Sequence, residues 1–119
     1  MGSKLILLVE DDDNLRHSIA LILKRAGYIV TPTECVYKAI NLLQSGDYRV
    51  VISDLHMNAT REILIPRILA AHPQLSLVLL TDHSITESEE ELPCTYYLTK
   101  PIAPERLLDS VQTIITMGN

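Results

Sequence analysis

Five polar side chains stand where short apolar runs end, and their types suit one kind of chemistry. Glu10 and Asp11 follow the first run, Asp54 the third and Thr81 the fourth, and Lys100 comes after the fifth. Neighbouring carboxylates repel one another, and a hard cation such as Mg²⁺ relieves that repulsion. An aspartate can accept a phosphoryl group as a nucleophile, and an ammonium and a hydroxyl can then neutralise the added oxygens. The five residue types together therefore indicate phosphoryl chemistry that depends on a metal.

These residues need a scaffold that brings the ends of their runs together. The apolar runs are short and nearly continuous, which is typical of strands buried on both faces, and amphipathic helical patterns separate them. Strands are expected at 4–9, 28–31 (ended by Pro32), 49–53, 75–80 and 95–98. Helices are expected from the acidic cluster 10–13 to Gly27, from Val36 to about Ser45, at roughly 60–71, and from Pro104 onward.

Several residues indicate where the expected helices begin, end or are interrupted. Asp12 or Asp13 suits the cap of the first helix, and Gly27 stands where a terminal glycine belongs. Pro66 lies inside the third helix, where its missing N–H should kink or delay the helix. Segment 84–92 is acidic and short of apolar residues, so a fourth helix there should be short, loosely packed or absent.

Alternating strands and helices predict an α/β fold with a parallel sheet covered on both faces. In such sheets function collects at the carboxyl ends of the strands. This rule places all five polar side chains at the same edge, where at least three carboxylates and one ammonium should share a shallow pocket. The acidic pair 10–11 could instead serve only the following helix, and Asp54 alone could simply cap a loop.

Composition limits the remaining possibilities. The 119 residues suit one domain over 1–119, and 47% hydrophobic residues allow a substantial core. The net charge of −5 and the lack of a basic stripe argue against nucleic-acid binding by this domain, and no apolar run is long enough to cross a bilayer. Cys35 and Cys94 have no CxxC spacing and are expected to be reduced thiols in a cytoplasmic protein. Met1–Ser3 is consistent with a cloning remnant.

Four stretches, taken in order, resemble the receiver domain of two-component response regulators. They are LILLVEDDDNLR at 5–16, VVISDLHM at 50–57, LVLLT at 77–81 and YLTKP at 97–101. The resemblance covers essentially the whole chain and implies a flavodoxin-like, doubly wound, five-stranded parallel sheet with strand order 2-1-3-4-5. It also implies a signalling function: a sensor histidine kinase or phosphotransfer protein phosphorylates the domain, and the change reaches a fused or separate output domain.

The resemblance also assigns roles to individual residues. Asp54 matches the phosphoacceptor, and Thr81 and Lys100 match the groups that bind the phosphoryl oxygens. The predicted ligands of Mg²⁺ (or Mn²⁺) are Glu10, Asp11, Asp54 and the backbone carbonyl of His56, with Asp11 a more direct ligand than Glu10. Thr81 and Tyr97 match the switch pair, and a cis peptide bond is implied before Pro101.

Three features depart from the family pattern. Asn58 stands where the family usually has proline. The glycine that is common a few residues later is missing, and Glu62 lies near its place. Asp82 occupies a position where the family usually has a small residue. A carboxylate there could repel the incoming donor, which suggests that Asp82 slows phosphorylation. Only 19 positions separate Thr81 from Lys100, and this shortening falls on the predicted fourth helix. His56 and His83 occupy positions that tune the lifetime of the phosphate in the family.

Alternative functions follow from these departures. The domain could be a receiver-like scaffold that no longer switches, which the altered loops would allow. A phosphohydrolase with an aspartyl nucleophile is disfavoured, because Asp54 follows the third strand and has no carboxylate two positions beyond it. A flavin carrier is weaker still, since no hydroxyl- and glycine-rich turn and no tryptophan is present. We therefore expect self-phosphorylation and autodephosphorylation, and no enzymatic activity beyond them.

Overall fold

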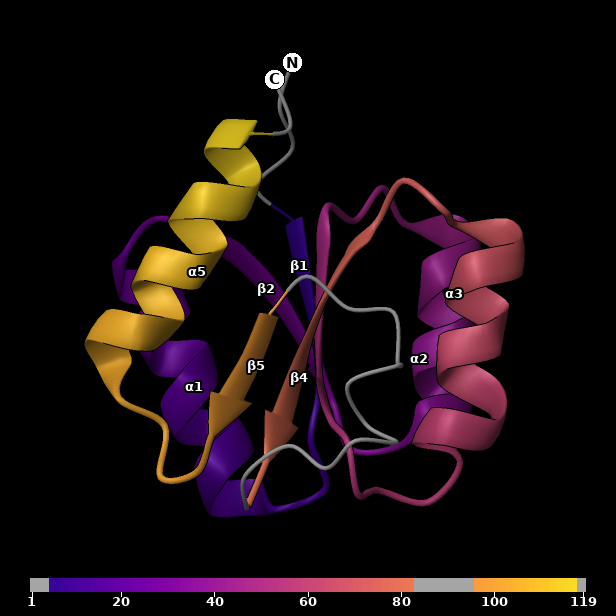
Figure 1. The fold of residues 1–119 in the computed structure, drawn as a ribbon, viewed down its shortest axis with the longest axis horizontal. Helices are drawn as coiled ribbons and strands as arrows, with labels where there is room; N and C mark the ends of the chain where they lie inside the picture. Colours follow the sequence, from indigo (N-terminus) through magenta and orange to yellow (C-terminus); the bar gives the residue numbers. More distant parts are fainter. Residues whose placement is uncertain (1–4, 83–95, 118–119) are drawn as a thin grey trace.

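A computed structural model describes residues 5–82 and 96–117 as a parallel sheet with helices on both sides (Figure 1). The strand order is β2-β1-β3-β4-β5, and every pairing is parallel. The predicted doubly wound α/β fold and its strand order are confirmed. The elements are β1 (Leu5–Val9), α1 (Asp13–Arg25), β2 (Ile29–Thr33), α2 (Val36–Ser45), β3 (Val50–Asp54), a π-helical turn (Thr60–Leu64), α3 (Ile65–Ala71), β4 (Ser76–Thr81), β5 (Tyr96–Thr99) and α5 (Pro104–Met117).

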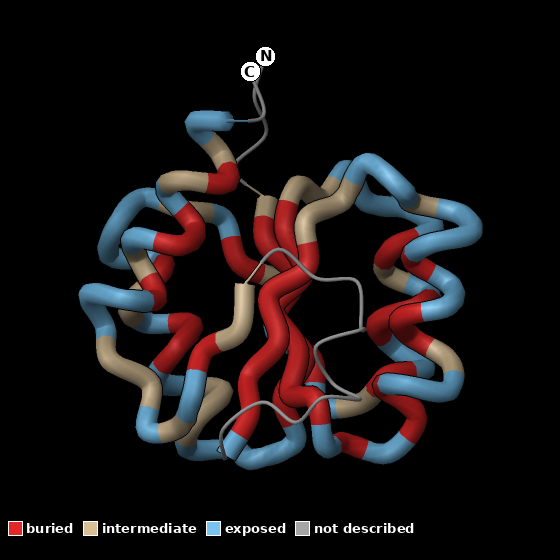
Figure 2. Tube along the Cα trace, in the orientation of Figure 1, coloured by how far each residue is buried: buried red, intermediate tan, exposed pale blue. Residues whose placement is uncertain are grey.

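The sheet separates two hydrophobic clusters, one on each face. Successive residues of a strand point to opposite faces, so a strand buried on both sides must be apolar throughout. Figure 1 shows α2 and α3 on one side of the sheet and α1 and α5 on the other, and Figure 2 shows the buried strands between them. Towards α2 and α3 the strands direct Leu7, Val9, Val51, Leu77 and Leu79. Towards α1 and α5 they direct Ile6, Leu8, Val50, Ile52, Val78, Leu80 and Leu98.

Local signals at the ends of the helices behave largely as the sequence indicates. The Asp12 carboxylate accepts a hydrogen bond from the Leu15 backbone N–H at 2.9 Å and caps α1. Gly27 follows this helix with φ +96°, a conformation that glycine adopts without strain. The cap of α2 is unusual, because the Cys35 sulfur accepts from the Lys38 backbone N–H at 3.4 Å.

The prediction that Pro32 ends the second strand is wrong, because β2 continues through it to Thr33. The position of β2 at the edge of the sheet explains this. In a parallel pair, alternate residues of an edge strand turn their backbone groups towards the neighbouring strand. The Thr33 carbonyl accepts from the Glu10 backbone N–H at 3.0 Å, so the preceding Pro32 faces the open edge, where no N–H is needed.

The region after β3 shows what the proline in the third helix does. Residues 60–64 form a π-helical turn, and regular α-helix begins only at Ile65, beside Pro66. The expected delay is confirmed, and its position places the proline in the first turn, where its missing N–H costs little. Ala59, just before the turn, has φ +74°, a left-handed conformation that is costly for a residue with a side chain.

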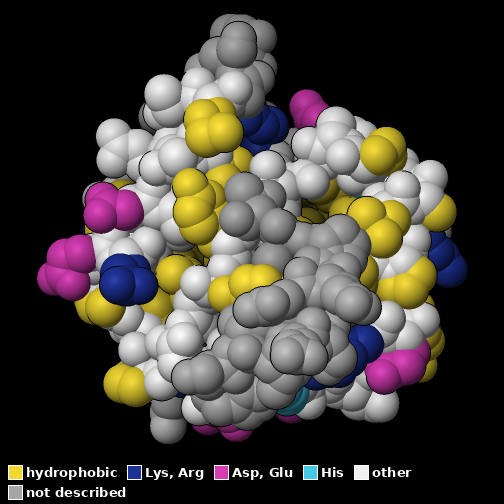
Figure 3. All heavy atoms as spheres, viewed as in Figure 1, with side chains coloured by type: hydrophobic (Ala, Val, Ile, Leu, Met, Phe, Trp, Pro, Cys, Tyr) yellow, Lys and Arg dark blue, Asp and Glu magenta, His cyan; other side chains and the backbone are white. Residues whose placement is uncertain are grey.

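Some expectations fall on parts of the chain that the structure does not describe. The shortened fourth helix, His83 and Cys94 all lie in 83–95, outside the described residues. Among the residues that are described, no helix is long and apolar enough to cross a membrane. On the face in Figure 3, acidic and basic side chains are interspersed around the margins, with hydrophobic side chains between them, and the described part of this face shows no basic stripe.

Candidate functional site

The five polar residues singled out in the sequence gather at the carboxyl-end edge of the sheet. Asp54 and Thr81 are the last residues of β3 and β4, Glu10 and Asp11 follow β1, and Lys100 follows β5. The strand register sets this arrangement, because Val9 pairs with Ser53, Asp54 with Leu80, and Thr81 with Thr99. Four strands distant in sequence thus end at the same level.

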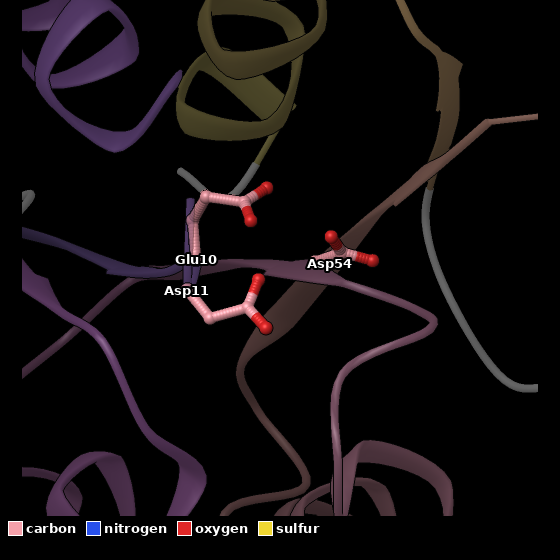
Figure 4. Close-up of side chains that lie close together, drawn as sticks. All are labelled: Glu10, Asp11 and Asp54. Carbon is pink, nitrogen blue, oxygen red and sulfur yellow. The ribbon is translucent and has the colours of Figure 1, made fainter. Parts of the chain in front are cut away.

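Three carboxylates face a common space. Glu10, Asp11 and Asp54 each offer an oxygen, and the three oxygens lie within 4.8 Å of one another. Figure 4 shows the carboxylates of Glu10 and Asp11 directed towards the side on which Asp54 lies. Glu10 and Asp54 are buried and Asp11 is exposed, so the cluster opens to solvent on the Asp11 side.

Lys100 joins the cluster as its cation. Its Nζ lies 2.7 Å from Asp54 Oδ2 and 3.4 Å from Glu10 Oε1. Burial alone would lower the pKa of Lys100, but the hydrogen bond to Asp54 and the charges of Glu10 and Asp54 outweigh it and raise that pKa. The peptide bond from Lys100 to Pro101 is cis, as the resemblance implies, and the Lys100 N–H donates to the Thr81 carbonyl at 2.7 Å. The lysine backbone is therefore tied to the end of β4.

Glu10 is the carboxyl group of the site whose charged form is disfavoured by burial. Its side chain is fully buried; Oε2 accepts from the Asp12 N–H at 3.1 Å, whereas Oε1 has no hydrogen-bond partner among the described residues and only the Lys100 ammonium at 3.4 Å as an ion-pair partner there. Burial raises the pKa of Glu10 to about 7; the hydrogen bond from Asp12 opposes this rise, and the charge of Asp54 adds to it. One ammonium does not balance three carboxylates, and a buried oxygen without a donor is costly.

These observations fit a divalent metal. All the donors are oxygens, which is the set that Mg²⁺ prefers, and the carboxylates lie close enough to share an ion. A cation there would also give Glu10 Oε1 a closer partner than the Lys100 ammonium at 3.4 Å. Glu10, Asp11 and Asp54 are the residues that could hold it, and the carbonyl of His56 as a further ligand stays a prediction.

His56 makes contacts that the sequence did not reveal. Its backbone N–H donates to Asp54 Oδ1 at 2.8 Å. Its imidazole Nε2 lies 3.2 Å from Thr81 Oγ1 and 3.6 Å from Asp82 Oδ1. Thr81 is fully buried, whereas the side chains of His56 and Asp82 are 33% and 66% exposed. Thr81 thus lies one residue beyond Leu80, the strand partner of Asp54, and its hydroxyl is in contact with the His56 imidazole.

Two further residues support the site and were missed in the sequence. The buried Thr60 hydroxyl donates to the Asp54 carbonyl at 3.0 Å and so anchors the loop that follows β3. The Arg16 guanidinium donates to the Glu10 carbonyl at 2.8 Å and pairs with Asp13 at 2.6 Å. A buried threonine at the start of a helix was the available signal for Thr60. An arginine six positions beyond Glu10 gave no such signal.

Tyr96 and Tyr97 lie on opposite faces of β5, as their adjacent positions require. Tyr97 is partly buried against the cluster on the α2 and α3 side, whereas Tyr96 packs against the cluster on the α1 and α5 side. The two tyrosines therefore lie on opposite faces of the sheet. The role of Tyr97 as a switch residue stays a prediction.

The fold and this site define a doubly wound domain with an acidic pocket at its strand ends. The family model of the response regulator receiver domain matches residues 6–112, and the chain belongs to that family. The chain is thus a receiver domain of two-component signalling, and domains of this family typically act in signalling.

Relatives and solved structures agree with this assignment. The chain is 30% identical over 111 residues to the C4-dicarboxylate transport transcriptional regulatory protein DctD of Rhizobium meliloti, covering 90% of this chain and 24% of that protein. It is 29% identical to the transcriptional regulatory protein CusR of Escherichia coli K12, covering 95% of this chain and 52% of CusR. The structure of Vibrio cholerae chemotaxis protein CheY4 superposes with a TM-score of 0.84 at 26% identity, covering 94% of this chain and 98% of that one. The chain therefore spans between about a quarter and half of these two regulators.

Proposed function

We propose that the domain accepts a phosphoryl group on Asp54, with Mg²⁺ or Mn²⁺ bound beside it, from a sensor histidine kinase or a phosphotransfer protein. One observation carries the proposal: the Asp54 carboxylate lies among two further carboxylates and is held by Lys100 at 2.7 Å. This arrangement presents a nucleophilic oxygen next to a cation-binding pocket. Its position at the carboxyl ends of the strands supports the proposal, because functional sites of such folds collect there.

The transfer forms one bond and breaks one. A carboxylate oxygen of Asp54 attacks phosphorus, and the bond to the donor breaks, so its electron pair leaves with the donor nitrogen or oxygen. Glu10, Asp11, Asp54 and the His56 carbonyl would hold the metal, which supplies positive charge to the transferring oxygens. The Lys100 ammonium neutralises a second oxygen, and the Thr81 hydroxyl donates to a third.

Lys100 changes partner during this reaction. In the unphosphorylated domain its ammonium binds Asp54 Oδ2 and lies near Glu10. Once phosphorus is attached, the negative charge moves outward to the phosphoryl oxygens, and the ammonium follows it. Movement of Thr81 towards the same oxygens, with Tyr97 turning inward behind it, would carry the change to β5.

The proposal also covers the setting of the domain. Residues 1–119 form one receiver domain, whose output domain is fused or separate, and this domain contacts neither nucleic acid nor membrane. A cytoplasmic location suits the free Cys35 thiol, because thiols persist in reducing compartments. Chemistry is limited to phosphorylation and dephosphorylation of the domain itself.

Mass spectrometry of the intact protein tests the proposal. With Mg²⁺ and acetyl phosphate we expect an adduct of about 80 Da, which base removes and EDTA prevents. Asp54→Asn should abolish the adduct, whereas Asp109→Asn, at an exposed position of α5, should leave it unchanged. A wild-type protein that forms no adduct would favour the scaffold. Rapid multiple turnover of phosphoesters would favour a hydrolase.

A further inference from the structure

The side-chain contact between His56 and Thr81 borders the acidic pocket and has no part in the transfer described above, although the Thr81 hydroxyl and the His56 carbonyl do. His56, from the loop after β3, reaches across to the end of β4, where Nε2 meets Thr81 Oγ1 at 3.2 Å. The same nitrogen lies 3.6 Å from Asp82 Oδ1. The imidazole therefore links two strand ends whose residues are 25 positions apart. The backbone of His56 also donates to Asp54 Oδ1 at 2.8 Å, so one residue contacts both the acceptor and the switch hydroxyl.

The contact matters because of what Thr81 has to do. Its side chain is fully buried, and its hydroxyl lies 3.2 Å from the imidazole nitrogen of His56. The hydroxyl has one proton to donate, and a neutral imidazole nitrogen is an acceptor for it. If Nε2 instead carries a proton, it donates to the hydroxyl oxygen. In either case the oxygen is held at the imidazole and must leave it to reach a phosphoryl group on Asp54.

Asp82 strengthens the arrangement. Its carboxylate is mostly exposed, yet it lies beside the same imidazole nitrogen and so favours a ring orientation towards β4. The backbone N–H of His56 fixes the other end of the residue on Asp54. The imidazole is thus restrained from both ends.

We propose, on the basis of the proposed phosphorylation of Asp54, that His56 is a positioning residue that holds the Thr81 hydroxyl in the unphosphorylated domain. Phosphorylation then moves the hydroxyl from the imidazole to the phosphoryl group. The His56–Thr81 contact stabilises the unphosphorylated arrangement and opposes the phosphorylated one, since a contact made in only one of two states biases the equilibrium towards that state. Loss of the contact should therefore favour phosphorylation.

Two variants of similar size separate the hydrogen bond from the bulk of the side chain. His56→Gln keeps a polar group near the place of Nε2, whereas His56→Leu removes it; both keep the backbone N–H and carbonyl of residue 56. In His56→Leu we expect phosphorylation by acetyl phosphate with Mg²⁺ to be about three- to tenfold faster. His56→Gln should lie close to the wild type. His72→Leu, at the residue that follows the C-terminus of α3, should match the wild type.

A spectroscopic reading makes the test specific. The ¹³C-methyl resonance of Thr81 in the unphosphorylated domain should shift in His56→Leu towards its position in the phosphorylated wild type, and His56→Gln should restore it. An adduct that forms and decays equally in wild type and His56→Leu, with an unmoved Thr81 resonance, would overturn the role of His56 and leave the proposed function intact. No adduct on the wild type would overturn both.

Discussion

The floor and the rim of the site differ in how closely they follow the family pattern. The floor, defined here as Glu10, Asp11, Asp54 and Lys100, has the expected residue types, and its charges converge as predicted. The rim, defined as His56, Thr81, Asp82 and the loop 57–60, contains an imidazole bridge, a carboxylate and a left-handed alanine. In the proposed function, phosphoryl acceptance depends on the floor and switching on the rim. The residues proposed to carry the chemistry thus follow the family pattern, whereas the residues around those proposed to control it depart from that pattern.

The largest expected effect concerns the floor. Lys100→Met removes the cation that binds Asp54 and should lower the rate of phosphorylation by at least about 100-fold, as loss of one preorganised charge-stabilising group does. Lys38→Met breaks only an exposed ion pair with Glu34 and should leave the rate unchanged. The adduct yield over time measures both. Equal rates in the two variants would mean that the floor does not bind the phosphoryl group as described.

The second prediction concerns Glu10 and pH. The pKa of Glu10 is raised from 4.5 to about 7 in the folded, metal-free domain. A raised pKa means that the protonated form contributes stability, which is fully present below pH 4.5 and is lost as the pH rises through 7. The metal-free domain should therefore lose up to about 3 kcal/mol of unfolding free energy over that range, and Mg²⁺ at pH 8 should restore much of it.

Glu10→Gln provides the control for this pH effect. An amide does not titrate, so the variant should have a flatter pH profile in urea unfolding and a smaller gain from Mg²⁺. A variant that keeps the full wild-type slope between pH 4.5 and 8 would place the titration on another group.

Thr60 tests how firmly the rim is attached to the floor. Thr60→Val removes the donor to the Asp54 carbonyl in a buried position and should cost about 1–2 kcal/mol of unfolding free energy. Thr113→Val, on a half-buried face of α5, should cost less than half as much. Urea midpoints give both values. If the affinity for Mg²⁺ also falls in Thr60→Val, the loop helps to position the metal ligands.

The smallest effect should come from Asp82. Asp82→Asn removes a mostly exposed negative charge beside the site and should speed phosphorylation by an anionic donor by about two- to fourfold at low salt. Screening should reduce this gain in about 0.5 M salt, where the Debye length is only a few Å. The gain in His56→Leu, which comes from a buried hydroxyl, should persist. Matching salt dependence in both variants would mean that the rim acts through charge alone.

The sequence was most informative where one physical rule determines the outcome. Apolar runs alternating with helical patterns can pack only as a covered parallel sheet, and the convergence of Asp54, Lys100 and the acidic pair follows from it. The order of the strands and the cis bond before Pro101 came from the resemblance. The delayed third helix could be predicted because one residue, Pro66, determines it.

Other features depend on tertiary context that a sequence does not display. Pro32 continues a strand because β2 is at the sheet edge, which is known only once the sheet is assembled. The left-handed Ala59 and the sulfur cap at Cys35 use residue types that rarely fill those roles. The contact between His56 and Thr81 joins two segments through side-chain rotamers, which no spacing rule predicts.

The most direct test of the central claim locates the acyl phosphate. Borohydride reduces an aspartyl phosphate to homoserine, which peptide mass spectrometry can assign to one residue. After treatment with Mg²⁺ and acetyl phosphate, we predict homoserine at position 54, no homoserine at Asp11, and no 5-hydroxynorvaline (the corresponding product of a glutamyl phosphate) at Glu10. Homoserine at another residue, or at none while the protein remains folded and binds Mg²⁺, would contradict the assignment of Asp54 as the phosphoacceptor.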